Sequence, residues 1–171
     1  CMVPYLMATD PFEEIFDNVL NITKAGSKID FGYHFIISTE EQLENVPLYV
    51  NMGIPSFKIF MNNRGGEGTR LGLPDLDDGF LFRLLESAAN SGGMVCPHPE
   101  NIEVAWVLRE RAMNSDPTGK EGLYSWDATR PDFVEADAVQ RAGMFATVTG
   151  TPLYIVHTSS ALALETGLSL R

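Results

Sequence analysis

Three side chains that can bind a metal, or be converted into a metal ligand, stand within or directly after short apolar segments. Lys58 lies inside SFKIFM, His98 follows MVCP, and His157 follows LYIV. A charged amine is costly to bury, so Lys58 must be paired, neutral or chemically modified. A neutral lysine reacts with carbon dioxide to form a carbamate that can bridge metal ions, and imidazoles suit zinc, nickel or iron. We therefore predict a metal site at Lys58, His98 and His157, with a metal-activated hydroxide as nucleophile.

Each of these residues also has a structural explanation. A lone buried lysine is most often paired with a carboxylate or extends its amine to solvent. His98 lies between two prolines and fits a loop, while His157 fits a hydrogen-bonded core position. His34 stands within a strand-like segment rather than at its end, so we expect it to belong to the core. Spacing alone leaves the metal and the structural explanations open, because the three side chains meet only if their segments form a barrel.

The elements that must position these residues alternate between strand-like and helical segments. Apolar or β-branched runs predict strands at residues 2–7, 31–37, 56–61, 94–96 and 153–156. The spacing of apolar residues predicts helices at residues 12–23, 40–50, 76–89, 102–113, 131–148 and 159–165. Strict alternation favours an α/β fold with a parallel sheet, in which functional residues lie at the carboxyl ends of the strands. A doubly wound sheet and a segment of a (β/α)8 barrel both fit this pattern.

Composition excludes several classes of partner. The chain of 171 residues has 12 Lys and Arg against 23 Asp and Glu, a formal net charge of -11, so we expect neither a nucleic acid nor an anionic membrane as partner. No apolar run approaches the roughly 20 residues that span a bilayer. Cys1 and Cys96 form no CxxC motif, which favours a reducing, cytoplasmic location. The chain begins within a strand-like run and ends after an apolar helical one, so we expect an internal piece of a longer protein.

Four separated motifs resemble those of one enzyme family, in its order and spacing. They are SFKIFM at 56–61, HPEN at 98–101, TRPDFVEADAVQRA at 129–142 and LYIVHTSS at 153–160. Together they resemble the cyclic-amide hydrolases of the amidohydrolase superfamily, above all the dihydropyrimidinase and D-hydantoinase family. The resemblance implies a partial TIM barrel of about five consecutive β-α units, with residues 1–171 as the central segment of one metal-dependent barrel domain. It also implies a binuclear centre, usually zinc, in which a carbamylated Lys58 bridges the metals and His98 and His157 bind the second one.

Two departures from the family pattern affect this interpretation. The HxH motif that supplies the family's first ligands does not occur in the chain, and the family's catalytic aspartate follows a strand later than any in it. The family tyrosine that stabilises the oxyanion falls on Asn63, an amide with shorter reach, which we predict to bind substrate. This difference leaves an allantoinase-like ring hydrolase open. Arg130, Pro131 and Glu135 match a motif that fits helix entry and packing, and no chemistry is assigned to them.

The resemblance implies the hydrolysis of a cyclic amide, such as a dihydropyrimidine or hydantoin ring, by a metal-activated hydroxide. The expected cofactors are two divalent metal ions, most often zinc, together with a carboxylated Lys58. The expected partners are a small-molecule cyclic amide and, in the full-length protein, further copies in a homotetramer. We expect the 171 residues alone to be inactive, because they lack part of the family's ligand set. The alternative is a non-catalytic dihydropyrimidinase-like scaffold protein, for which the retained Lys58, His98 and His157 would have no use.

Overall fold

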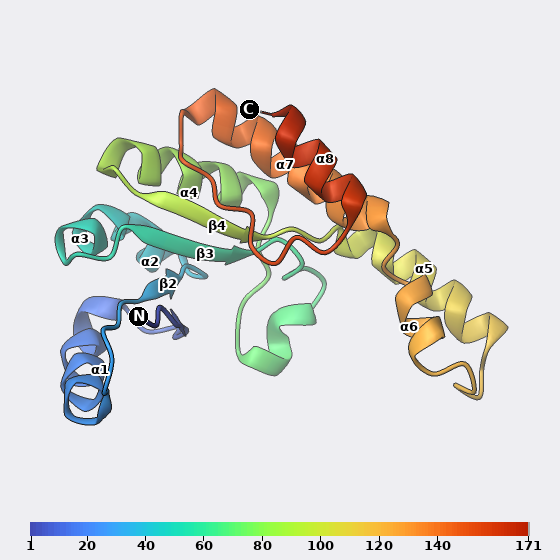
Figure 1. Ribbon diagram of the computed structural model, residues 1–171, viewed down its shortest axis with the longest axis horizontal. Coiled ribbons are helices and arrows are strands. Elements are labelled where there is room, and N and C mark those ends of the chain that lie inside the picture. Colours follow the sequence, from blue (N-terminus) through green and yellow to red (C-terminus); the bar gives the residue numbers. More distant parts are fainter. Residues whose placement is uncertain (171) are drawn as a thin grey trace.

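The computed structural model describes residues 1–170 and shows a parallel sheet covered by helices (Figure 1). The strands are β1 (Tyr5–Leu6), β2 (His34–Ile36), β3 (Ser56–Phe60) and β4 (Met94–His98). They pair in the order β1-β2-β3-β4, and every pair is parallel. The alternation of strands and helices that the sequence predicts is therefore confirmed.

Helices connect successive strands and follow the last one. They are α1 (Phe12–Gly26), α2 (Glu40–Glu44), α3 (Val46–Asn51), the short 3-10 helix η1 (Glu67–Leu71), α4 (Asp78–Ser91), α5 (Ile102–Ser115), α6 (Leu123–Ala128), α7 (Asp132–Thr149) and α8 (Ala161–Ser169). Side-chain caps fix the start of four of them, since Thr39, Asp77, Asn101 and Ser160 accept hydrogen bonds from the first turns of α2, α4, α5 and α8. No helix among residues 1–170 is long and apolar enough to cross a membrane.

The strand order bears on the two architectures that fit the sequence. Each strand pairs with the next strand along the chain, so the order never reverses among residues 1–170. Crossovers between parallel strands are almost always right-handed, and a constant direction of winding places the connecting helices on one face of the sheet. A doubly wound sheet reverses its strand order to cover both faces. The four strands are therefore compatible with a segment of a barrel.

The two faces of the sheet have different chemistry. Phe35, Phe57 and Val95 are fully buried and point toward the helices, where the ring of Phe35 stacks on that of Phe12 at 4.0 Å between centroids. Alternate residues point to the opposite face. These are Tyr5, His34, Ser56, Lys58, Phe60, Cys96 and His98. Helix packing thus forms the apolar core on one face, and the potential functional residues lie on the other.

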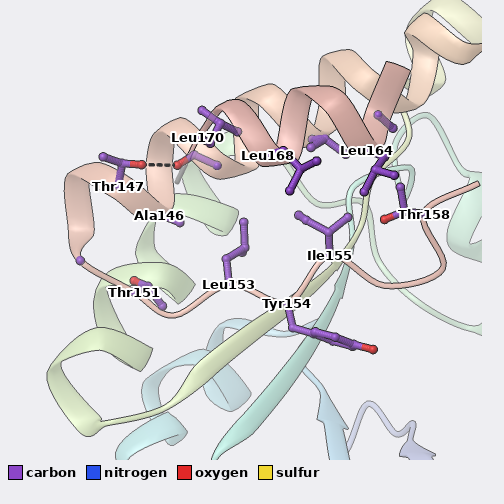
Figure 2. A pocket seen from close by; sticks show the side chains of 15 residues that line it. Ala146, Thr147, Thr151, Leu153, Tyr154, Ile155, Thr158, Leu164, Leu168 and Leu170 are labelled. Atoms are coloured by element: carbon purple, nitrogen blue, oxygen red, sulfur yellow. Dashed lines mark hydrogen bonds between the residues drawn. The ribbon is translucent and has the colours of Figure 1, made fainter. Parts of the chain in front are cut away.

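The fifth predicted strand, residues 153–156, is not a strand in the structure. The segment is extended but joins the sheet only through an isolated parallel bridge between Val95 and Leu153, with the Tyr154 amide donating to the Val95 carbonyl at 2.9 Å. Its other side faces a groove of about 520 Å³ beside α7 and α8, into which Leu153, Ile155 and Leu168 point (Figure 2). The backbone therefore has a strand neighbour on one side only, and four strands form instead of about five.

Two further predictions differ from the structure in detail. The helix predicted at residues 40–50 is divided into α2 and α3, because Asn45 ends the first and Pro47, which has no amide hydrogen, stands in the first turn of the second. Residues 62–74 and 114–129, where the sequence predicts no helix or strand, contain η1 and α6. Cys1 and Cys96 are both free, as expected for a chain without a disulfide framework.

We expect Phe35→Ala to lower the free energy of unfolding by roughly 3–5 kcal/mol, because it leaves a cavity among the rings of Phe12, Phe16 and Tyr49. Urea denaturation followed by circular dichroism measures the loss. Ile22→Ala is the matched control, since Ile22 is 65% exposed and its truncation should change little. Equal effects of the two substitutions would contradict the assignment of the core.

Candidate active site

A cleft of about 780 Å³ opens at the carboxyl ends of β3 and β4. Its walls come from these strand ends, from η1, from α6 and the start of α7, and from the turn before α8. Residues that line it include Phe60, Asn63, Glu67, Arg70, His98, Glu100, Trp126, Arg130, Glu135 and His157. The cleft therefore lies at the edge of the sheet where the sequence places its functional residues.

His98 and His157 meet in this cleft. His98 is the last residue of β4, and its Nδ1 lies 2.9 Å from Nε2 of His157. Two imidazole nitrogens at this distance can share a proton or can both direct lone pairs to one ion. The side chain of His157 is exposed, so the hydrogen-bonded core position that was its alternative explanation is wrong.

The backbone of His157 is strained. With φ of 40°, it is the sole residue other than glycine with a positive φ in the described part of the chain. Such a conformation costs roughly 1–3 kcal/mol and persists only where surrounding contacts impose it. In this conformation the imidazole of His157 contacts His98 at the end of β4. The contacts that hold the backbone of His157 therefore also hold the imidazole in the site.

Lys58 lies on the same face of the sheet as His98 and is 3% exposed. Its Nζ has no hydrogen-bond partner, and lies 5.1 Å from the ring centroid of Phe60 and 5.5 Å from that of Tyr5. The Phe60 ring in turn lies 5.7 Å from the ring of His98. Burial lowers the pKa of Lys58 to about 8, an effect that Cys96 partly opposes. A carboxylate partner, the usual explanation of a buried lysine, is thus absent among residues 1–170.

Asn63 lies at the edge of the same cleft. Its side chain is 3% exposed, and its Nδ2 has no hydrogen-bond partner among the described residues. Backbone bonds hold the residue in place, because its amide donates to the Phe60 carbonyl and its carbonyl accepts from Leu76 at 2.6 Å. Buried donors in folded proteins normally have partners. The Nδ2 of Asn63 is therefore a buried donor at the edge of the cleft, packed close to Gly68 and without a partner among residues 1–170.

The loop that carries Asn63 is fixed to α5. Oε1 of Glu67 accepts hydrogen bonds from Nε1 of Trp106 at 2.9 Å and from Arg109 at 2.8 Å. The hydrogen bond from Arg109, more than that from Trp106, lowers the pKa of Glu67 and keeps it ionised. Gly65 packs against the same indole so closely that a Cβ would lie 2.5 Å from it. The loop after β3 and the helix after β4 therefore form one wall.

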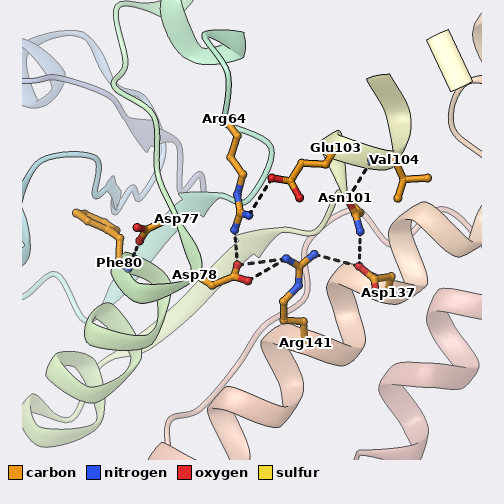
Figure 3. A network of polar contacts seen from close by, with 9 residues as sticks. All are labelled: Arg64, Asp77, Asp78, Phe80, Asn101, Glu103, Val104, Asp137 and Arg141. Carbon is orange, nitrogen blue, oxygen red and sulfur yellow. Dashed lines mark hydrogen bonds and ion pairs between the residues drawn. The ribbon is translucent and has the colours of Figure 1, made fainter. Parts of the chain in front are cut away.

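A polar network outside the lining of the cleft joins segments that follow β3 and β4 (Figure 3). Asp78, at the start of α4, pairs with Arg64 from the loop after β3 and with Arg141 from α7 at 3.0 Å. Arg141 also pairs with Asp137 at 3.0 Å, and Asp137 accepts from Asn101 of the HPEN motif at 2.7 Å. One chain of polar contacts thus connects the residues that follow β3 with the residues that follow β4.

Sequence reasoning missed three charged residues of the cleft. Nε of Arg130 donates to Glu100 at 2.7 Å, its guanidinium lies 4.0 Å from the ring of Trp126, and Glu100 lies 3.7 Å from Nε2 of His98. Burial raises the pKa of Glu100, but the opposing effects of His98 and Arg130 are together larger, so the pKa of Glu100 is lowered. Glu135 contacts the turn after His157. Glu100 lies in the HPEN motif and Arg130 in the TRPD motif, but the sequence pattern does not show that these two residues pair.

His34 lies partly buried on the face of the sheet opposite the apolar core, so its predicted place in the core is wrong, although its contacts are structural. Its Nδ1 lies 2.6 Å from the hydroxyl of Ser56, and its ring stacks on that of Tyr5 at 4.8 Å between centroids. Burial, more than the charge of Lys58, lowers the pKa of this imidazole. His34 does not line the cleft, so it belongs to the sheet and not to the site.

Comparison with known proteins finds D-hydantoinases both by sequence and by structure. No family model matches the chain. It is 37% identical to a D-hydantoinase of Rhizobium radiobacter over 133 residues, and 32% identical to an allantoinase of Deinococcus radiodurans over 150 residues. The solved structures of a D-hydantoinase and of the dihydropyrimidinase from Brevibacillus agri superpose with TM-scores of 0.82 and 0.80, at 29% and 27% identity, over 99% of the chain.

The chain belongs to the dihydropyrimidinase and D-hydantoinase family. The matches cover 77% of this chain and 27% of the Rhizobium relative, and 88% of this chain and 32% of the Deinococcus relative. The two solved chains are covered to 36% and 35%. The chain thus spans about a third of the length of its relatives, whose names are those of cyclic-amide hydrolases.

The described residues fit part of a metal centre. His98 and His157 converge, and the amine of Lys58 is buried without a partner on the same face of the sheet. Within residues 1–170 no group of three or more His, Cys, Asp and Glu side chains is arranged to hold a metal ion. These residues therefore offer two imidazoles and a lysine.

Gly65→Ala should disrupt the wall formed by the loop and α5 more than Gly72→Ala does. Both glycines have a positive φ, of 56° and 70°, and alanine costs roughly 1–2 kcal/mol in such a conformation. Only at Gly65 does the new Cβ also collide with Trp106, at 2.5 Å, whereas nothing lies within 4 Å at Gly72. Tryptophan emission and the free energy of unfolding measure the difference, and equal values for the two variants would contradict the packing.

Proposed function

We propose that this chain contributes part of the active site of a metal-dependent hydrolase that opens a cyclic amide. The observation that carries the proposal is the buried, unpartnered amine of Lys58 on the same sheet face as the paired imidazoles of His98 and His157. Membership of the dihydropyrimidinase and D-hydantoinase family supports it. In the reaction a ring C–N bond breaks, water supplies a hydroxyl group to the carbonyl carbon, and the leaving nitrogen receives a proton.

The residues that would hold the metal are Lys58, His98 and His157. Reaction of the Lys58 amine with carbon dioxide replaces a buried cation by a carboxylate, which explains why no acidic partner lies beside it. We propose two divalent ions, zinc by the preference of imidazole and carboxylate ligands, with the remaining ligands supplied by other parts of a full barrel. When bound, the metal supplies an activated water and polarises the substrate carbonyl.

The other residues of the cleft bind and orient. Asn63 lines the cleft, and its unpartnered Nδ2 would turn toward a ring carbonyl and donate a hydrogen bond to it, since the carbonyl oxygen becomes more negative as the ring opens. Glu100, held by Arg130, lies 3.7 Å from Nε2 of His98 and orients this imidazole with Nδ1 toward His157. Phe60 and Trp126 give the cleft apolar walls against the ring. These roles require no further catalytic group from the chain.

The candidate substrates are rings that share one arrangement of polar groups. Relatives of this chain are named D-hydantoinase and allantoinase, and hydantoin, dihydropyrimidine and allantoin rings all present adjacent carbonyl and NH groups. Asn63 is shorter than the tyrosine expected at its position and leaves more room in the cleft, which favours a ring with a polar substituent. Hydrolysis of hydantoin, dihydrouracil and allantoin by the full-length protein should be compared directly.

Lys58→Ala in the full-length protein should remove bound metal and cyclic-amide hydrolysis together, because it deletes the bridging carboxylate. Elemental analysis measures the metal, and product formation measures the activity. His34→Gln is the matched control, since His34 bonds Ser56 outside the cleft and its replacement should leave both intact. Retention of hydrolysis at normal metal loading in Lys58→Ala would disprove the proposal, and a wild-type protein that purifies without metal would favour the scaffold alternative.

Carbamylation of Lys58 should persist to lower pH than that of an exposed lysine. Only the neutral amine reacts with carbon dioxide, and burial lowers the pKa of Lys58 from 10.5 to about 8. The carbamate should decrease steeply as the pH falls below 8, because the amine becomes protonated and because carbamate formation itself releases a proton. Carbon-13 NMR with labelled carbon dioxide at constant dissolved concentration measures this, with Lys58→Met as the blank and an exposed lysine such as Lys120 as the reference. A pH dependence of Lys58 equal to that of the exposed lysine would contradict the lowered pKa.

A further inference from the structure

Both histidines of the cleft are fixed to the same short piece of helix. On one side, the amide of Asn101 donates to the carbonyl of Val134 at 3.0 Å, and its side chain donates to Asp137 at 2.7 Å. Asn101 is three residues after His98, so these bonds place the end of β4 against the first turns of α7 (Figure 3). The position of His98 is therefore set relative to α7 by two hydrogen bonds that do not involve its own ring.

On the other side, Glu135 holds the segment that follows His157. Its carboxylate accepts hydrogen bonds from the Ser159 amide at 2.9 Å, from the Ser159 hydroxyl at 3.1 Å and from the Ser160 amide at 2.8 Å. The two amides precede α8, where a negative charge is also favoured by the helix dipole. Three bonds to one carboxylate fix the backbone two residues after His157, the residue with φ of 40°.

We propose that Glu135 is the positioning residue that holds His157 against His98, with the first turns of α7 as a common support for both imidazoles. This inference extends the proposed function, because the two imidazoles that it aligns are the proposed metal ligands. The extended segment 153–156 has only one strand neighbour, so the sheet alone constrains His157 weakly. The contacts of Glu135 provide the missing constraint and sustain the strained backbone of His157. Packing between helices does not require these contacts, because the buried face of α7 is formed by other residues such as Ala138 and Ala142.

Glu135→Gln should separate the two imidazoles while leaving the fold intact. Glutamine has one acceptor oxygen where the carboxylate has two, and its NH2 group faces donors. In the full-length protein, NMR can follow the rings of the three histidines of this segment, each assigned from a variant that lacks it. In the wild-type chain we expect a ring-to-ring nuclear Overhauser effect between His98 and His157, whose centroids lie 4.6 Å apart. In Glu135→Gln this signal should disappear and the resonances of His157 should shift, while those of His34 remain unchanged.

Glu165→Gln is the matched control, because Glu165 is exposed on α8 and has no hydrogen bond or ion pair with any described residue. It removes the same charge near the same segment and should leave all three imidazoles as in the wild type. If Glu135→Gln proves unfolded by circular dichroism, Ser159→Ala replaces it, since it deletes only the hydroxyl contact at 3.1 Å. A shift of the His157 resonances in Ser159→Ala supports the inference, and unchanged His157 resonances in whichever folded variant is measured overturn it.

Zinc affinity gives a second, separable readout. Loss of a residue that orients a metal ligand typically lowers affinity by about 10–100-fold. Competition with a chelating dye should therefore show weaker zinc binding by Glu135→Gln than by the wild type and by Glu165→Gln, measured in the full-length protein. Failure of the wild type to bind zinc would defeat the proposed function but not the NMR result. Unchanged zinc affinity together with unchanged imidazole signals in Glu135→Gln would defeat the positioning role alone.

Discussion

The parallel pairing of β3 with β4 determines where Lys58, Phe60 and His98 lie, and the other contacts of the site are built around these three residues. Its register sets Lys58 opposite Cys96 and Phe60 opposite His98. Because side chains alternate along a strand, the same register directs Lys58, Phe60 and His98 to one face and directs Phe57 and Val95 to the helices. A shift of the register by one residue would exchange the buried core and the polar face. The core that stabilises the fold therefore also specifies the site.

Charged contacts fix the segments of the cleft that the sheet does not hold. Segments that follow different strands have few backbone bonds to one another, and the cleft depends on Glu67, Asp78 and Glu135 to join them. Each of these carboxylates accepts hydrogen bonds from donors on another segment. Glu67 thereby connects η1 with α5, Asp78 connects α4 with α7, and Glu135 connects α7 with the turn before α8. Partly buried networks of this kind contribute more to geometry than to net stability. The arrangement leaves the amine of Lys58 and the amide of Asn63 as donors that no residue of the network satisfies.

The sequence predicted local structure least well where that structure depends on contacts with residues distant in the chain. Residues 153–156 have the apolar, β-branched composition of a strand, but they form only one bridge, because strand formation requires a neighbour with matching backbone groups. Pro47 divides a helix that the apolar spacing presents as continuous. Glu135 and Arg130 resemble residues of a helix start, and their partners in the HTSS and HPEN segments are distant in sequence. Pairing between distant residues has no local signal.

The sequence by itself determined the alternation of strands and helices, the carboxyl ends of the strands as the place of the functional residues, and the resemblance to one enzyme family. Local periodicity and the residues at strand ends carry this information without any knowledge of the partners of each segment. Only the tertiary structure decided that the strand order runs in one direction, that Lys58 has no acidic partner, and that His98 and His157 lie 2.9 Å apart. These properties depend on distances between residues far apart in the chain, and such distances are set when the helices and the sheet pack together.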